Sequence, residues 1–280
     1  MTKYTVTAMT TEYWRPAENY LQKIIAHTKN KLANGDIILI SEKALAVATN
    51  SIIDENTIKA SLNAKLIAHF WMRLIWAQLL GRLCHFPAKL LKNLQEYPLE
   101  MGAKHKQTAL KHTNPLQALM FGSEGGIDGS NLPYSLVSLP LRNADKLAAE
   151  IRDTVKLRLQ KETCVMITDT DKTYTFHGFH WTPRSTSVKG IHSFGGLIAY
   201  LVGRMFRFKR RSTPVAMAGC RLDVENALRI AEAANRARGH GAGRNVWEMA
   251  ENFGVSLSEV TWEMLDRVKH KPIVIVRAKR

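Results

Sequence analysis

Residues 64–86 are the most apolar stretch of the chain, and they decide what kind of protein it can form. The stretch is long enough for a membrane span, but Lys65, His69 and Arg73 recur every four residues, and Arg82 follows. Charged groups are costly inside a bilayer, and this spacing places them along one face of a helix. The stretch therefore predicts a half-buried helix of a globular protein, with a helix lying on a membrane surface as the second possibility.

The bulk composition limits the possible partners. With 280 residues and 45% apolar residues, the chain can bury a real core, so a disordered protein is excluded. The net charge of +16 favours nucleotide phosphates, acidic metabolites, nucleic acid or a lipid surface, although adaptation to a cytoplasm of basic proteins would also explain it. Cys84, Cys164 and Cys220 have no metal-binding spacing and form no even set, which predicts a reducing, cytoplasmic location. Segment 1–14 has no apolar core of the signal-peptide type.

Helical and strand patterns alternate along the chain, which predicts an α+β or α/β fold. Apolar residues with helical spacing and short buried-type apolar runs carry this prediction. Helices are expected at 17–33, 143–160, about 195–206 and 223–238, and strands at 37–40, 164–170, 214–219 and 272–276.

Two isolated acids are the first candidates for chemistry. Asp128 lies in the Gly-rich turn "SEGGIDGSN", and Asp169 ends the apolar run "TCVMITDTD" beside Thr170. Oxygen ligands from two segments suit Mg²⁺ or Mn²⁺ held partly by substrate phosphates. As single residues, however, both aspartates could equally cap a turn and a loop.

Three segments resemble the coenzyme F420-0:gamma-glutamyl ligase family in the same order and with the same spacing. They are "EYWRPAENYLQKIIAHTKNKLANGDIILISEK", "SEGGIDGSNLPYSLVSLPLRNADKLAAEIRD" and "VMITDT". The resemblance covers about 12–60 and 113–171, and "STPVAMAG" at 212–219 looks like a later strand of the family.

The resemblance implies an α+β fold, an intertwined homodimer and an amide ligase. The family uses GTP and a divalent metal, Mg²⁺ or Mn²⁺, to join glutamate to a phospholactate-linked flavin. Such a reaction requires the carboxylate to be activated, as in an acyl phosphate, before an amine attacks. The partners expected on this basis are a nucleotide and an anionic small molecule, without specific nucleic acid and without a transmembrane span.

Residue by residue, the resemblance also implies a site. The metal ligands would be Asp128, Asp169 and Thr170, and the nucleotide pocket would contain Glu42, Lys43 and Asn131. It further implies a catalytic region at 1–219, with a basic and apolar helical insertion at about 61–112, and a helical C-terminal region at 220–280 that ends in a strand.

The chain departs from the family in several places, which leaves its acid and amine open. Val47 replaces a common lysine, "DTDKTYTF" lacks the downstream arginine of the family, and Arg211 stands where a carboxylate is expected. Region 64–112 has no recognised counterpart. The basic run Arg207, Lys209, Arg210 and Arg211 is expected to bind phosphate or substrate, with a solvated face as the equal alternative.

A DNA-binding protein is the rival function. Segment 249–265 has the spacing of a helix-turn-helix, but the helix expected from Ser256 carries Glu259 and Glu263 before its first arginine. In a ligase, this segment should instead pack Val255, Leu257, Val260 and Leu265 against the body of the protein.

Two loop motifs are weaker signals. His177, His180 and His192 lack the spacing of a strong zinc motif, and contacts with an anionic substrate or with solvent are the better interpretation. "GHGAGR" at 239–244 is more simply a helix end than a phosphate loop.

Overall fold

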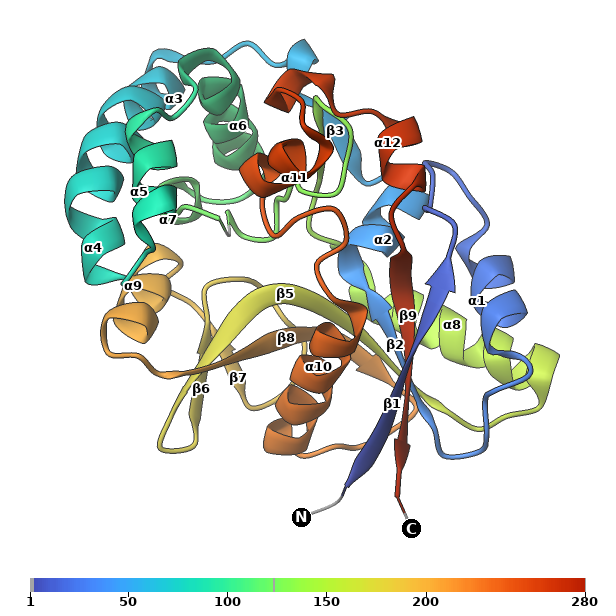
Figure 1. Ribbon diagram of the computed structural model, residues 1–280. Helices are drawn as coiled ribbons and strands as arrows, with labels where there is room; N and C mark the ends of the chain where they lie inside the picture. Colours follow the sequence, from blue (N-terminus) through green and yellow to red (C-terminus); the bar gives the residue numbers. More distant parts are fainter. Residues whose placement is uncertain (1–2, 123, 280) are drawn as a thin grey trace.

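A mixed sheet forms the centre of the molecule in the computed structural model, which describes residues 3–122 and 124–279 (Figure 1). Among these residues, seven strands follow the order β1-β9-β2-β5-β6-β7, with β8 paired to β5. β2 and β5 are parallel, whereas β9 is antiparallel to both β1 and β2. Their bounds are β1 Tyr4–Thr11, β2 Ile37–Ser41, β5 Cys164–Phe176, β6 Phe179–Thr182, β7 Ile191–Ser193, β8 Lys209–Ala218 and β9 His270–Ala278.

Helices cover both faces of this sheet because its central strands are apolar on both sides. Ile38 and Ile40 face the core that contains α1 (Tyr20–Thr28), α2 (Glu42–Ala48) and α8 (Ala144–Leu159). Ile37 and Leu39 face the core beneath α10 (Val224–Arg238). Successive strand residues point to opposite faces, so the run "IILI" supplies both cores. The mixed α+β class is confirmed, and α1, α8 and α10 fall within the predicted ranges.

A separate group of helices makes a third core, at the side drawn in cyan and green in Figure 1. Met72, Trp76, Phe86, Phe121 and Tyr200 are among its buried residues. The helices that build it are α3 Leu62–Leu66, the π-helical η2 Ile67–Leu80, α4 Gly81–Leu83, α5 Ala88–Gln95, α6 Leu99–His112, α7 Pro115–Ala118 and α9 Leu197–Met205.

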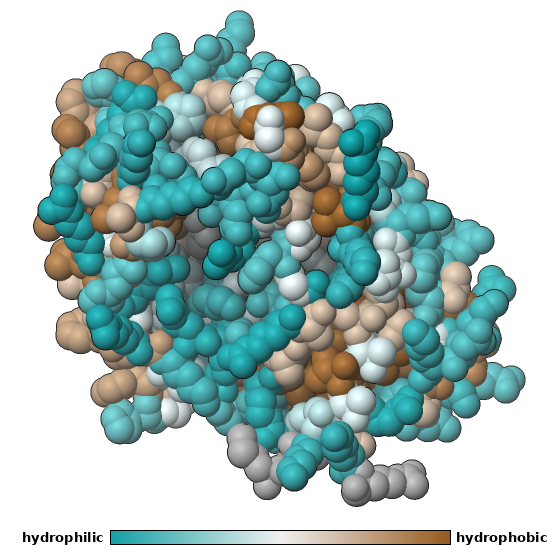
Figure 2. All heavy atoms as spheres, viewed as in Figure 1, coloured by the Kyte–Doolittle hydropathy of each residue, from teal (hydrophilic) through white to brown (hydrophobic). Residues whose placement is uncertain are grey.

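The apolar stretch 64–86 forms the half-buried helix that its pattern predicts. Ala68, Met72 and Trp76 are fully buried, again at a spacing of four residues. A second apolar row is exposed, with Phe70 and Leu74 each 52% accessible. Figure 2 shows apolar residues gathered on this side of the molecule. Among the described residues, none of the helices combines the length and hydropathy that crossing a membrane requires.

Two strands differ from their predicted positions. β8 begins at Lys209 rather than at Pro214, because the polar residues 209–212 pair with the equally polar second half of β5. β9 lies between β1 and β2 in the main sheet, so the end of the 220–280 region is joined to the N-terminal strands (Figure 1).

Segment 249–265 packs on the body of the protein, as expected for the ligase. Val260 and Leu265 are buried in a core with Tyr13, and Val255 and Leu257 pack against it. The helix expected from Ser256 is two short pieces, which cannot serve as one recognition helix. The elements of this segment are α11 Val246–Phe253, the 3₁₀ turn η3 Leu257–Glu259 and α12 Trp262–Asp266.

A small second sheet lies outside the main one. It pairs β3 Ile52–Asp54 with β4 Leu136–Ser138, and the 3₁₀ turn η1 Glu55–Thr57 follows β3.

The cysteine expectation is corrected by a disulfide. Cys164 begins β5 and Cys220 follows β8, and the pairing of these strands brings their Cα atoms to 5.2 Å and joins their sulfurs. Cys84 remains a free, buried thiol. The sequence did not indicate this pair, because its two cysteines lie 56 residues apart and the three cysteines show no regular spacing.

Candidate functional site

Two neighbouring cavities meet where β5 leaves the sheet core. The cationic cavity, of about 390 Å³, is lined by Lys43, Lys172, Arg204, Arg238, Lys269 and Lys271. The apolar cavity, of about 220 Å³, is lined by Tyr97, Met101, Phe121, Trp247, Met249 and Leu257. Asp128, Asp169, Thr170 and Asp171 line both cavities, and we call these four residues the junction.

Parallel pairing explains why the candidate residues converge. β2 and β5 run in register from Ile37 beside Cys164 to Ser41 beside Thr168. β2 ends at Ser41 while β5 continues to Phe176, so the residues that follow β2 lie beside Asp169 at the carboxyl end of the parallel pair, where ligands commonly bind. Glu42 and Lys43 therefore meet Asp169 although more than a hundred residues separate them.

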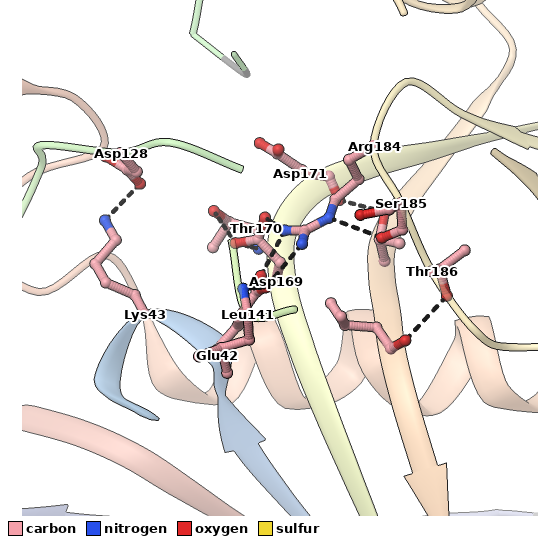
Figure 3. A network of polar contacts seen from close by, with 12 residues as sticks. Glu42, Lys43, Asp128, Leu141, Asp169, Thr170, Asp171, Arg184, Ser185 and Thr186 are labelled. Atoms are coloured by element: carbon pink, nitrogen blue, oxygen red, sulfur yellow. Dashed lines mark hydrogen bonds and ion pairs between the residues drawn. The ribbon is translucent and has the colours of Figure 1, made fainter. Parts of the chain in front are cut away.

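Arg184 holds the two carboxylates at this edge (Figure 3). Its guanidinium donates to both oxygens of Glu42, at 2.5 and 2.8 Å, and to Asp169. Glu42 also accepts a hydrogen bond from the backbone nitrogen of Leu141 at 3.0 Å. Arg184 and Glu42 are 1% and 3% exposed, so the pair is shielded from water.

Burial and pairing act in opposite directions on these groups. Burial raises the pKa of Glu42, which Arg184 opposes only in part. Burial also acts to raise the pKa of Asp169, but Arg184 and Lys43 outweigh it, so the pKa of Asp169 is lowered. Burial alone would lower the pKa of Arg184, but Glu42 and Asp169 raise it. Asp169 is therefore an ionised carboxylate on the wall of both cavities.

Lys43 connects the first strand to the Gly-rich turn. Its ammonium pairs with Asp128 and donates to the carbonyl and hydroxyl oxygens of Ser130, each at 2.8 Å. Asp128 also accepts from the nitrogen of Ser130 at 2.7 Å, and Asp169 accepts from the nitrogen of Thr170 at 2.6 Å. Both aspartates thus hold their own turns, as the alternative interpretation stated, and also face the same cavities.

Asn131 ties the turn to the "GHGAGR" segment. Its amide accepts from the nitrogen of Ala242 at 2.6 Å and donates to the carbonyl of Gly243 at 2.9 Å. A Cβ at Gly241 would lie 2.4 Å from the Asn131 amide oxygen, so this close approach requires glycine. The segment ends α10 as predicted, and it also lines the cationic cavity.

The structure does not bring the basic run to either cavity. The guanidinium of Arg211 is buried against Glu225, with contacts of 2.6 and 2.8 Å, and donates to Thr175 at 2.8 Å. Lys209 also pairs with Glu225, at 3.2 Å. Arg207 and Arg210 are absent from the lining of both cavities as well. The strand that carries the run pairs with β5 so that Arg211 lies opposite Thr173, two residues beyond the junction, and its side chain turns to Glu225.

Cations from other elements line the cationic cavity instead of that run. Arg238 ends α10 beside the cationic cavity, and no ion pair among the described residues involves it. Burial lowers the pKa of Arg238 to about 10, and Asp169 opposes this shift. Sequence reasoning missed both Arg238 and Arg184. The signal for Arg184 was one arginine in the Ser/Thr-rich loop "TPRSTS", which a local pattern does not distinguish from a surface residue.

The loop histidines form no metal site. His180 shares a hydrogen bond of 2.9 Å with Thr175, and the ring of His192 stacks on Phe179. Among the residues that the structure describes, no group of three or more His, Cys, Asp or Glu side chains is arranged to hold a metal by itself.

The sequence and the mixed fold agree with a known family of ligases. The chain belongs to the F420-0:gamma-glutamyl ligase family, whose model matches residues 9–244. It is also similar to an uncharacterized protein of Methanocaldococcus jannaschii, with 30% identity over 281 residues, which cover 96% of this chain and 94% of the relative. The resemblance noted from the motifs is thereby confirmed.

Proposed function

We propose that this protein is a metal- and nucleotide-dependent amide ligase. It activates a carboxylate as an acyl phosphate, using GTP, for attack by the amine of an amino acid. The observation that carries the proposal is the meeting of Lys43, Asp128, Asn131 and Asp169 on one cavity whose other charged residues are mostly cationic. A cavity of this charge suits a triphosphate, and its size of about 390 Å³ is within the usual range for ligand pockets.

The junction offers the ligands that Mg²⁺ or Mn²⁺ prefers. Asp128, Asp169 and Thr170 present hard oxygens, and magnesium in nucleotide sites is commonly held by only one or two carboxylates plus phosphate oxygens. The absence of a larger acidic group among the described residues is therefore compatible with such a metal. When bound, the metal would neutralise phosphate charge.

The chemistry requires two displacements, and this chain's residues would position the reactants. An oxygen of the acid's carboxylate first bonds to the γ-phosphorus as GDP leaves. The amine nitrogen then bonds to the carbonyl carbon as inorganic phosphate leaves. Lys43 and Arg238 would bind phosphate oxygens, while Asn131 holds the turn and the 239–244 segment in place.

Stabilisation by nucleotide tests this proposal. GTP with Mn²⁺ should raise the unfolding temperature, because a ligand that binds only the folded state stabilises it by about 2.7 kcal/mol at a hundred times its Kd. Asp169→Asn and Asp128→Asn should abolish the metal-dependent part, whereas Asp153→Asn, on the exposed face of α8, should retain it. Failure of both GTP and ATP to stabilise the wild type with either metal would overturn the proposal.

The assembly and location belong to the same proposal. We propose a homodimer in which a second copy covers the exposed row of Leu62, Leu66, Phe70 and Leu74, because large exposed apolar patches commonly mark interfaces. A cytoplasmic location stays a prediction.

A further inference from the structure

The apolar cavity beside the junction is a built chamber with aromatic walls. The ring of Trp247 lies 6.2 Å from that of Tyr97, edge to face, and 5.8 Å from that of Phe121. Met101 and Met249 complete the wall, and methionine adapts well to the surface of a ring. The volume of about 220 Å³ exceeds the roughly 150 Å³ of a protein cavity that holds benzene. One ring with a short side chain would therefore fit.

The charged residues around the apolar cavity differ from those of the cationic cavity. His105 pairs with Glu55 at 2.9 Å, and the fully buried Lys106 pairs with Glu124 at 2.7 Å. Lys106 also donates to the carbonyl oxygen of Met120 at 2.5 Å. The other charged residues of this lining are Arg244 and the three junction aspartates, so carboxylates outnumber cations here. The chamber differs in this from the cationic cavity on the other side of the junction.

Part of the wall comes from outside the motifs that carry the resemblance. Tyr97 and Met101 lie in the helical region 61–112. Trp247 and Met249 lie beyond residue 244, where the family match ends. These four side chains form the part of the wall in which a different substrate would be selected.

We propose that the apolar cavity binds the apolar, ring-bearing body of one of the two substrates, whose reacting head group reaches the junction. This inference rests on the proposed ligase function, because the phosphates would occupy the cationic cavity and leave this chamber to another reactant. The shared chemistry is an apolar ring on a short chain. The head group is a carboxylate if the cavity serves the acid and an amine if it serves the nucleophile.

Ring-bearing and ringless probes test the chamber. Calorimetric titration of the full chain would compare 3-phenylpropionate with propionate, and 2-phenylethylamine with ethylamine. We expect at least one ring-bearing probe to bind ten times more tightly than its ringless counterpart, and the pair that shows the gain identifies the head group. Equal affinities within both pairs would overturn the inference.

Substitutions then locate the binding. Met101→Trp should fill the chamber and lower the affinity of the ring-bearing probe at least tenfold, whereas Leu157→Trp, at an exposed residue of α8, should leave it unchanged. If Met101→Trp does not fold, Trp247→Ala is used in its place. Removal of the Trp247 ring from the wall should also weaken binding of the ring-bearing probe. Unchanged affinity in a folded wall variant would place the probe elsewhere and refute the inference.

The two proposals fail separately. Met101→Trp should retain stabilisation by GTP and Mn²⁺, because Met101 does not line the cationic cavity. If the ring-bearing probe binds but no nucleotide stabilises the protein, the proposal for the apolar cavity stands and the proposed ligase function is rejected. A nucleotide response without ring selectivity would do the reverse.

Discussion

Arg184 is the side chain that completes the strand edge. Glu42 follows β2, Asp169 lies within β5, and Arg184 comes from the loop after β6, so three segments meet in one buried ion pair network (Figure 3). Two carboxylates this close repel each other unless a cation lies between them. Arg184 therefore makes it possible for Asp169 to remain ionised beside the junction.

Loss of this cation should be costly to the fold. Arg184→Met leaves two buried carboxylates without their partner, and we expect the free energy of unfolding to fall by about 3–5 kcal/mol. Urea denaturation at neutral pH measures this loss. Arg15→Met, which breaks the exposed pair with Asp266 at 2.5 Å, is the control and should cost about 0–1 kcal/mol. Losses of equal size would show that Arg184 has no special structural role.

At the scale of the element, α6 carries two consecutive buried cations, of which His105 lines the apolar cavity. Burial alone would lower the pKa of His105, but Glu55 and Glu124 outweigh it and raise the pKa to about 10. Burial would raise the pKa of Glu124, but Lys106 and His105 lower it to about 2. The helix is thus held to η1 and to the 124–129 turn by charges that persist at neutral pH.

This arrangement predicts a stability that depends on alkaline pH. The pKa of His105 is higher in the folded state than its ordinary value of 6.5, so its contribution is complete below about pH 6.5 and is lost as the pH rises through about 10. Each pKa unit corresponds to about 1.4 kcal/mol, so the stability difference between wild type and His105→Gln should shrink by on the order of 4 kcal/mol between pH 6 and pH 10. Urea unfolding at the two pH values measures the difference. His177→Gln, in the exposed turn after β5, serves as the control, and a difference for His105→Gln that does not change with pH would contradict the prediction.

For the whole molecule, the sheet unites the ends of the chain, while the helices at 62–118 form a second body with its own core. One row of this body is exposed, with Leu62 72% and Leu66 44% accessible. Contact with another apolar surface would remove such a row from water, and exposed apolar patches therefore commonly mark interfaces.

The proposed dimer makes this row a target for mutation. Phe70→Glu together with Leu74→Glu should convert the dimer into a monomer. The native side chains are about half exposed, so the new glutamates place charge at the interface and not in the core. Sedimentation at micromolar concentration would report the mass, and circular dichroism would check that the fold is intact. Leu157→Glu, at a site 78% exposed on α8, should leave the mass unchanged. A wild-type protein that is already monomeric would exclude the proposed interface.

Local periodicity determined the elements whose stabilising contacts lie along one face. The apolar spacing in 143–160 and 223–238 and the run "IILI" predicted α8, α10 and β2, because burial on a helix or strand repeats with a fixed period. The same reasoning identified Asp128 and Asp169, since an acid in a glycine turn or directly after an apolar run is visible locally, although β5 continues past Asp169 to Phe176.

The tertiary structure alone decided which charges meet. Arg184 reaches Glu42 across 142 residues, whereas Arg211, which the motifs had favoured, pairs with Glu225 away from the junction. The early start of β8 and the Cys164–Cys220 pair likewise depend on how β8 lies against β5. Strand pairing and long-range ion pairs are set by which surfaces the whole chain buries together, and no local pattern records that choice.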